Sequence, residues 1–394
     1  MQSRTTTLQS KTILVIIDDV LSALIRKGEI TDRYYNPGEL FDDVHILMTN
    51  DDRPDRADVQ RMVGHATLYV HHLPPLSFKR TLGWQRSLTR SWLDLGLNIA
   101  RQVRPLIVRT YGNCLGGFLG AHIKKQLGIP LVVSLHTDPD ESQRGRTPWW
   151  PPSSLTRRVR LERRKTLERV ALTAADCVIA VCEPYGEYAI RYGTHRVQVI
   201  PNVLNPDHLH RKTSYDLHSP PRIVSVGRQI SGKNPENLIR AVADLPVVLT
   251  LVGDGELHEH LRQVATHSGA LDRVTFLRAV GNDELCEMLS DFDIFAVHCS
   301  YSGIPKAVIE PLLVGLPVVI NRERPRTPEL DGDWVLAVHD TRLGYRQALL
   351  DLIQQHQVRA ALGARGYDYA HRHFSPQKVE QQLVNLYREL VPSL

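Results

Sequence analysis

Cysteine is scarce in this sequence, and its arrangement argues against a metal site or a disulfide framework. The five cysteines are an odd number in 394 residues, and no two of them form a C-x-x-C pair. Zinc sites and disulfide-stapled secreted domains depend on such pairs or on even sets of cysteines. We therefore expect no bound metal, and we expect a reducing, cytoplasmic environment.

Long apolar runs and concentrated charge are missing as well. No stretch approaches the roughly 20 apolar residues that a membrane-spanning helix needs, and the N-terminal residues MQSRTTTLQSK have no apolar signal core. The 48 basic residues exceed the 43 acidic ones only slightly, which is unlike the dense charge of a dedicated nucleic-acid binder. We expect a soluble protein, attached at most to the cytosolic face of a membrane, that binds no nucleic acid.

The sequence does contain a regular series of short apolar, β-branched runs. In the first half these are KTILVII, DDVHILM, PLIVRTY, IPLVVSLH, DCVIAVC and VQVIPN, and in the second half RIVSVG, VVLTLVG, RVTFLRA, DIFAVHC, LPVVIN and WVLAV. Runs that are apolar throughout are typical of parallel strands buried on both faces. Because they alternate with helical or loop segments, they predict an α/β fold of two doubly wound, Rossmann-like domains.

A polar segment, NPDHLHRKTSYDLHSPP, divides the two series. We place the boundary here, with an N-terminal domain over residues 1–210 and a C-terminal domain over residues 211–375. The last segment, SPQKVEQQLVNLYREL, begins with Ser and Pro and has apolar residues at helical spacing. It predicts a terminal helix over about 376–394 that packs back toward the N-terminal domain.

Two such domains facing each other would bring the carboxyl ends of both sheets to one central cleft, where open α/β sheets bind ligands. The segment Ser302–Pro317 follows a predicted strand, so it begins on a strand-end loop, and Pro305 suits the first turn of a helix. Free N–H groups at that helix start favour a phosphate or a sugar hydroxyl, and Glu310 is close enough to accept hydrogen bonds from a ribose diol. A solvated strand–loop–helix is the alternative for this segment alone.

Neighbouring strand-end loops add charge and glycine. After RIVSVG, the loop offers Arg228 and Lys233 with two glycines that permit close backbone approach. A guanidinium forks onto phosphate oxygens and an ammonium acts as a point charge, so the pair suits a diphosphate, with a solvated turn as the alternative. The loops LVGDGEL and LRAVGNDEL follow the next two strands. All of these loops are predicted to converge on one site.

In this order and approximate spacing the segments resemble those of the family-4 retaining glycosyltransferases, two-domain enzymes of the GT-B architecture. The resemblance is strongest over residues 222–390, through VGRQISGKN, LVGDGE, SGIPKAVIEPLLVGLPVV and the closing helix, and it extends through LGIPLVVSLH, ADCVIAVCEPYGEY and VQVIPNV. It implies that a hexose passes from a nucleotide-sugar donor to a hydroxyl of a glycan or lipid-linked acceptor with retained anomeric configuration. A donor phosphate oxygen would take the acceptor's proton, and no cofactor or metal is implied.

The resemblance assigns roles by matching position. Arg228 and Lys233 would hold the donor diphosphate and stabilise the leaving group. His136, at the end of LVVSLH, would contact the transferred sugar; a structural histidine is the alternative. Glu310 would bind the ribose and Val280 would lie against the base. The other donor-binding residues would be Ser302, Gly303, Ile304, Pro305 and Lys306.

Three features depart from the family's pattern. The family usually has two glutamates separated by seven residues, and Ser302 stands at the first of these positions, where a hydroxyl can bind a sugar but supplies no carboxylate. Pro311 follows Glu310 and predicts a kinked or late-starting helix. A glycine-rich loop after the first strand is missing, and Lys27-Gly28-Glu29 is the nearest candidate for its role.

A basic segment of the first half bears on the acceptor. Trp149 and Trp150 precede a predicted helix, and such a surface suits anionic lipid headgroups or an acidic acceptor, with a solvated helix face as the alternative. The basic residues of this helix are Arg157, Arg158, Arg160, Arg163, Arg164 and Lys165.

Two further functions stay open at this stage. Ser302 motivates a non-catalytic relative that binds a nucleotide or glycan for a partner protein. An epimerase of the same architecture would isomerise a nucleotide sugar without any acceptor. The remaining histidines, among them His71, His72, His258 and His260, show no ligand arrangement, and we expect them to be surface or core residues.

Overall fold

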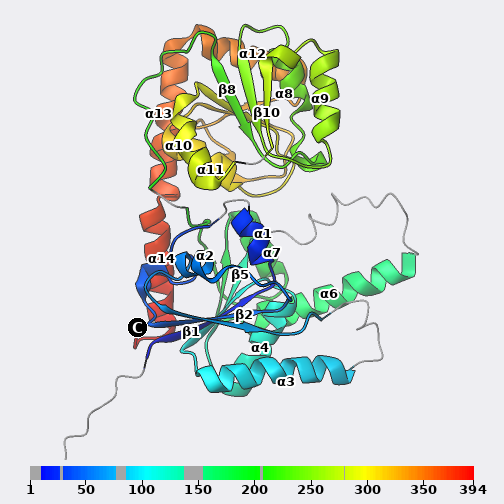
Figure 1. Cartoon of the computed structure of the whole chain (residues 1–394), viewed down its shortest axis with the longest axis vertical. Coiled ribbons are helices and arrows are strands. Elements are labelled where there is room, and N and C mark those ends of the chain that lie inside the picture. Colours follow the sequence, from blue (N-terminus) through cyan, green and yellow to red (C-terminus); the bar gives the residue numbers. More distant parts are fainter. Residues whose placement is uncertain (1–9, 27–29, 77–85, 137–153, 205–206, 279) are drawn as a thin grey trace, which may run out of the picture.

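The two series of strands form two separate, wholly parallel sheets. The computed structural model describes residues 10–26, 30–76, 86–136, 154–204, 207–278 and 280–394, with the backbone alone for 86–88 and 154–160. Figure 1 shows the sheets in two domains stacked along the long axis of the molecule. The predicted fold, two Rossmann-like α/β domains, is confirmed.

The N-terminal sheet has seven strands in the order β3-β2-β1-β4-β5-β6-β7. Its strands are β1 Thr12–Ile17, β2 Asp43–Met48, β3 Thr67–His72, β4 Ile107–Tyr111, β5 Leu131–Leu135, β6 Cys177–Ala180 and β7 Val197–Val199. Its helices are α1 Leu21–Arg26, α2 Arg56–Arg61, α3 Arg86–Val103, α4 Leu115–Leu127, α6 Ser154–Ala174 and α7 Glu183–Arg191. The central strand β1 is buried at every residue, as expected of a strand covered on both faces.

The C-terminal sheet has six strands in the order β10-β9-β8-β11-β12-β13. Its strands are β8 Arg222–Val226, β9 Val248–Val252, β10 Val274–Leu277, β11 Ile294–Val297, β12 Val318–Asn321 and β13 Leu336–Val338. The helices that follow the linker are α8 Glu236–Val242, α9 His258–His267, α10 Asn282–Met288, α11 Lys306–Val314, α12 Arg342–Gln354 and α13 His356–His373. Every strand predicted in this half is present.

One strand, β3, was not predicted from the sequence. It lies at the edge of the N-terminal sheet, and its residues TLYVHH are mostly exposed or half-buried. An edge strand is covered less than a central one, so it has no continuous apolar run to mark it. The omission follows from its position.

The chain returns to the N-terminal domain through its last helix, α14 Pro376–Leu390. Figure 1 shows α13 beside the C-terminal domain and α14 beside the N-terminal one. Val379, Leu383 and Leu386 of α14 are buried in the same core as alternate residues of β1. The predicted terminal helix is confirmed, although the Ser375 hydroxyl donates to the Gln377 side chain instead of capping the helix.

Each sheet has one point at which its strand order reverses. In the N-terminal sheet this point lies between β1 and β4, and in the C-terminal sheet between β8 and β11. At such a switch point the two crossover connections leave in opposite directions, so a crevice opens beyond the carboxyl ends of the strands. The residues that fill each crevice decide what it can bind.

Candidate active site

The switch point of the C-terminal sheet is flanked by the loop after β8, which carries the two predicted cations. Arg228 is exposed, and within the part of the chain that the structure describes it forms no ion pair. Lys233 ends a short 3-10 turn, Ser231–Lys233. This loop is joined to the loop after β11 by the hydrogen bond that the Ser300 N–H donates to the Gly232 carbonyl, at 2.9 Å. The basic side chains of Arg228 and Lys233 therefore lie on a loop beside the switch point.

Gln229 holds the loop of Arg228 against the loop after β9. Its buried side chain donates to the Gly253 carbonyl at 2.8 Å, and its carboxamide oxygen lies 2.8 Å from Nδ1 of His258. The loops are so close that a Cβ at Gly253 would lie 2.1 Å from the Gly227 carbonyl oxygen. Only glycine fits at this approach. The loops after β8 and β9 therefore lie against each other, and His258 is a core residue as expected.

The loop Ser302–Pro305 passes from β11 to the start of α11. Ser302 and Ile304 are buried, and Gly303 has a left-handed φ of 88°. The Gly303 N–H donates to the Thr327 hydroxyl at 3.2 Å. The helix begins at Lys306, so Pro305 is its N-cap and not a residue of its first turn. An N-cap residue still presents the helix start to the loop side.

Glu310 is buried within α11 and only 3% exposed. Its Oε1 accepts a hydrogen bond from the Asn282 side chain at 3.0 Å, which ties it to the start of α10. Pro311 was predicted to kink this helix or to delay its start; α11 begins at Lys306 and runs to Val314 with Pro311 inside it. Val280, two residues before α10, is half-buried against the same core cluster that contains Ile309. Glu310 and Val280 thus lie on adjoining elements.

His136 lies on the opposite domain, directly after β5. Its Nδ1 is 2.9 Å from the Asn202 carboxamide oxygen, and its ring stacks on Tyr111 with centroids 5.6 Å apart. Nε2 is buried and has no hydrogen-bond partner among the described residues. Burial, and then the charges of Arg109 and Lys306, lower the pKa of His136 to about 4, while Asn202 opposes the change. The imidazole is therefore neutral near pH 7, with the Nε2 lone pair available.

The two sides meet through direct contacts between the domains. Tyr185 of α7 donates its hydroxyl to the Ser302 carbonyl at 2.9 Å. The Lys306 ammonium lies 5.8 Å from the centre of the Tyr34 ring, and Tyr34 is packed against Tyr111. Lys306 therefore lies near the aromatic rings beside His136, and its charge acts on that imidazole. Of the predicted residues of the C-terminal domain, Ser302 and Lys306 therefore lie next to the N-terminal domain.

The N-terminal switch point is occupied by a side chain of the protein itself. Asp18 follows β1, accepts a hydrogen bond from Thr49 at 2.8 Å, and accepts another from the Gly116 N–H at 3.2 Å. A Cβ at Gly112 would lie 2.7 Å from the Asp18 carboxyl. Burial is the main reason that the pKa of Asp18 is raised. The helix start of α4, where a phosphate would bind, is thus already used by a carboxyl group.

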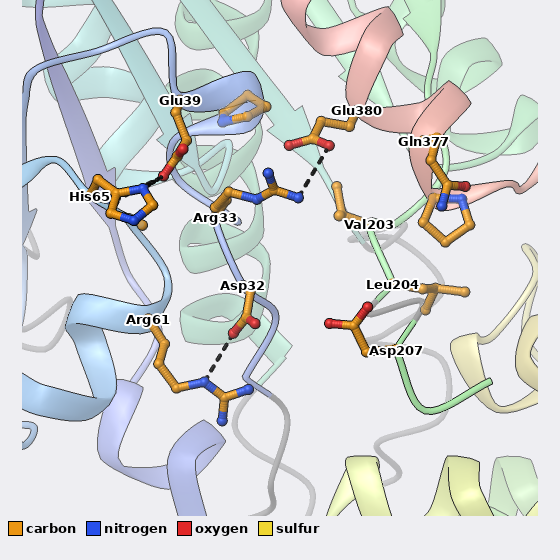
Figure 2. A pocket seen from close by; sticks show the side chains of 13 residues that line it. Asp32, Arg33, Glu39, Arg61, His65, Val203, Leu204, Asp207, Gln377 and Glu380 are labelled. Atoms are coloured by element: carbon orange, nitrogen blue, oxygen red, sulfur yellow. Dashed lines mark hydrogen bonds and ion pairs between the residues drawn. The ribbon is translucent and has the colours of Figure 1, made fainter.

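A cavity of about 460 Å³ lies beside α14 and not at either switch point. Figure 2 shows its basic side chains already matched with carboxylates: Arg61 with Asp32, Arg33 with Glu380, and His65 with Glu39. Arg61 also reaches Asp283 of the other domain at 3.6 Å. Because its charges are compensated internally, this cavity is a poorer phosphate site than the loop of Arg228.

Several predicted features fall outside the described residues. These are Lys27-Gly28-Glu29, Trp149 and Trp150, together with the side chains of Arg157, Arg158 and Arg160. The basic helix itself is present as α6, which projects from the N-terminal domain in Figure 1. Arg164 is turned toward the protein, since it donates to the buried Glu168 at 2.6 Å.

Sequence reasoning missed four residues that shape the site. Asn202 orients His136, Gln229 holds the loop of Arg228, and Asp18 fills the N-terminal switch point. Arg109, in the middle of β4, is buried beneath Tyr111. A visible signal existed for Arg109 and Asp18 only: one is a charge inside the apolar run PLIVRTY, and the other directly follows KTILVII.

No group of three or more potential metal ligands occurs among the described residues. In the same part of the chain, no helix is both long and apolar enough to cross a bilayer.

Family models match both halves of the chain. The model of the glycosyl transferase 4-like domain matches residues 38–203, and the model of glycosyl transferases group 1 matches residues 210–368. The two matches meet at the linker between the sheets.

Three curated relatives share between 21% and 29% sequence identity with this chain. The lipopolysaccharide core biosynthesis glycosyltransferase LpsE of Rhizobium meliloti is 29% identical over 54% of this chain and 64% of its own length. An uncharacterized glycosyltransferase of Methanocaldococcus jannaschii is 21% identical over 83% of this chain and 86% of its own. A GDP-mannose-dependent phosphatidylinositol monomannoside mannosyltransferase of Mycolicibacterium smegmatis is 29% identical over 40% and 44%.

Solved structures share the whole fold. Anabaena HepE in complex with UDP superposes with a TM-score of 0.72 at 17% identity, over 96% of this chain and 100% of HepE. Sucrose-phosphate synthase of Thermosynechococcus elongatus gives a TM-score of 0.70 at 18% identity, over 98% and 100%. With a family model on each half and this architecture throughout, the chain belongs to the glycosyltransferases of the GT-B type.

Proposed function

We propose that the protein transfers a hexose from a nucleotide-sugar donor to a hydroxyl of a glycan or lipid-linked acceptor, with retention of the anomeric configuration. The observation that carries this proposal is the contrast between the switch points: Arg228 and Lys233 flank one, and Asp18 fills the other. A diphosphate is attracted to the first and finds its helix start already occupied at the second. HepE, solved with UDP and with UDP-glucose, and relatives named as GDP-mannose-dependent support a nucleotide-sugar donor.

In this proposal the donor lies across the C-terminal half of the cleft. Arg228 and Lys233 hold the diphosphate and stabilise the negative charge that grows on it as the glycosidic bond breaks. Glu310, fixed by Asn282, accepts hydrogen bonds from the ribose. Val280 lies against the base, and the segment Gly303–Lys306 contacts the phosphate or sugar.

The acceptor approaches from the N-terminal side. Its hydroxyl attacks the anomeric carbon on the face from which the diphosphate departs, and a phosphate oxygen takes the proton, so the configuration is retained. His136 contacts the transferred sugar through Nε2. Ser302 supplies a hydroxyl where the family has a glutamate, so this position offers no negative charge beside the anomeric carbon.

A lipid-linked or anionic acceptor is supported by two observations. Relatives are named for lipopolysaccharide core and for phosphatidylinositol mannoside synthesis. The helix α6 projects from the N-terminal domain and carries half-exposed Arg163 and Lys165. Peripheral contact with an anionic membrane is part of the proposal, and sedimentation with vesicles of anionic and neutral lipid tests it. Equal sedimentation with both would contradict it.

The decisive assay follows release of nucleoside diphosphate from a panel of UDP- and GDP-sugars, with and without candidate acceptors. Turnover should be lost in Arg228→Ala and in Lys233→Ala. Arg222→Ala is the matched control, because this exposed arginine lies at the opposite end of β8. The anomeric proton of the product, observed by NMR, reports whether the configuration is retained.

Each outcome selects among the three functions. Transfer that requires Arg228 and an acceptor supports the proposal. Donor binding without turnover in the wild type would instead support a binding protein. Gain of turnover in Ser302→Glu would then show that the missing glutamate is the reason for the lack of turnover. An isomerised nucleotide sugar formed without acceptor would indicate an epimerase.

A further inference from the structure

Arg109 is a buried cation in the middle of a central strand. It is 3% exposed, and among the described residues no carboxylate pairs with it. Its guanidinium donates to the Tyr387 hydroxyl at 2.7 Å and to the Ser134 hydroxyl at 3.2 Å. Burying an uncompensated charge destabilises a fold. An aliphatic residue would pack the core at lower cost, so the charge itself requires a reason.

The alternation of side chains along β4 and β5 directs Arg109 toward the cleft. Arg109 and Tyr111 lie on one face of the sheet, and the register of β4 with β5 puts Ser134 on that same face. His136 continues the series one step beyond the end of β5. The Arg109 guanidinium carbon lies 4.4 Å from the centre of the Tyr111 ring, and that ring stacks on His136 at an angle of 19°. A continuous stack therefore links the buried cation to His136.

The surroundings fix which form of His136 faces the cleft. Asn202 accepts from Nδ1, so the single proton of the neutral ring is on Nδ1 and the Nε2 lone pair is left available. Two cations act on the ring, Arg109 from β4 and Lys306 from α11, and both oppose protonation of Nε2. Tyr111 and Tyr34 form the aromatic surface beside it. No carboxylate is among the groups that act on the ring.

We propose that Arg109 is a positioning residue for the transfer reaction: through Tyr111 it orders His136 and keeps its imidazole neutral, so that Nε2 accepts a hydrogen bond from a hydroxyl of the transferred sugar. The inference rests on the proposed function. Positive charge develops on the sugar ring as the donor bond breaks, and an imidazolium at this position would repel it. Arg109 is itself shielded from the sugar by the Tyr111 ring.

The test compares Arg109→Met with Tyr387→Phe. The first variant removes the charge, and the second removes one hydrogen bond of Arg109 but keeps the charge. In the ligand-free protein, NMR titration of His136, assigned with His136→Gln, should show that Arg109→Met raises its pKa by on the order of one unit. The acid limb of the pH profile of kcat should move to higher pH by a similar amount. Tyr387→Phe should change neither quantity, and Arg109→Lys should restore both toward the wild type.

An unchanged His136 pKa in folded Arg109→Met would overturn the inference. If Arg109→Met does not fold, the wild type still decides, because a His136 that titrates near 6.5 in the intact protein is not held neutral. Failure of the proposed function is distinguishable from failure of this inference. The first is an absence of donor turnover in the wild type, whereas the His136 titration needs no turnover.

Discussion

The two halves of this protein share one sheet architecture but differ in what occupies the point where the strand order reverses. In the N-terminal sheet, Asp18 fills the switch point and binds the Gly116 N–H at the start of α4. In the C-terminal sheet, the same position is bordered by the loop of Arg228 and Lys233, and Gln229 and Gly253 hold that loop in place. A fold alone does not determine a ligand. The difference between a carboxyl group and two cations is our reason for proposing that the donor binds in the C-terminal half.

The halves also differ in whether a mutation of a proposed site residue should change the stability of the fold. Arg228 is exposed, so its removal leaves the packing intact. His136 packs on Tyr111, and Arg109 is bound by Tyr387 of α14, so both are part of the packing of this domain. Activity and stability should therefore respond together in the N-terminal half and separately in the C-terminal half.

The largest effect is expected from the C-terminal cations. Arg228→Ala should lower kcat/KM for the donor about 10²–10³-fold, because the charge that develops on the departing diphosphate loses a direct partner. Steady-state kinetics together with thermal melting measure both quantities. The melting temperature should stay that of the wild type. A variant with a lower melting temperature but normal kinetics would contradict the claim that Arg228 serves the donor and not the fold.

Gly253→Ala should lower the free energy of unfolding by about 3 kcal/mol, because its Cβ would lie 2.1 Å from the Gly227 carbonyl oxygen and its φ is 134°. The matched control is Gly269→Ala, which also has a positive φ of 72° but no atom within 4 Å. The control should cost only about 1 kcal/mol. Urea unfolding distinguishes the two, and equal costs would show that the two loops are not in close contact.

Acid should destabilise the N-terminal half first. Burial lowers the pKa of His45 and of His136 to about 4, from an ordinary value of 6.5. Between about pH 6.5 and pH 4 these two histidines are protonated in the unfolded chain but not in the folded protein. The free energy of unfolding therefore falls as the pH falls through this window. Urea unfolding at pH 7 and pH 5 measures the loss. His45→Gln should show a smaller loss than the wild type, and an identical loss would be inconsistent with this account.

The smallest effect is expected at the cavity beside α14. Arg61 is about half exposed and is paired with Asp32 and Asp283. Arg61→Ala should change the free energy of unfolding by less than about 1 kcal/mol and donor kcat/KM by no more than about twofold. A loss as large as that of Arg228→Ala would place donor binding in the cavity of Figure 2 instead of at the switch point.

Much of the C-terminal half could be predicted because its information is local. Each buried strand is a continuous apolar run, and its functional residues lie on the loop that follows, so Arg228, Lys233 and Gly303 could be placed from spacing alone. The expectation at Pro311 was based on local sequence as well. Pro311 was expected to kink α11 or to delay its start; the helix begins at Lys306 and continues through Pro311, since tertiary packing on both sides of a helix can outweigh one missing hydrogen bond.

The N-terminal half was less predictable because its site is assembled over long sequence distances. His136 is oriented by Asn202, 66 residues away, and Arg109 is bound by Tyr387, 278 residues away. No spacing rule connects such pairs. The edge strand β3 was not predicted for a different reason: its half-exposed residues form no apolar run. The charge of Arg109 inside a buried strand, and Asp18 directly after another, were the local signals that something beyond packing is present in this half.

The most direct test of the central claim is equilibrium binding of UDP and GDP, measured by calorimetry, to three proteins: the wild type, Arg228→Ala/Lys233→Ala, and Asp18→Asn. The account predicts that the wild type binds one of the two nucleotides, that the double variant loses this binding, and that Asp18→Asn retains it. Binding that survives in the double variant but is altered by Asp18→Asn would place the nucleotide in the N-terminal half and contradict the account.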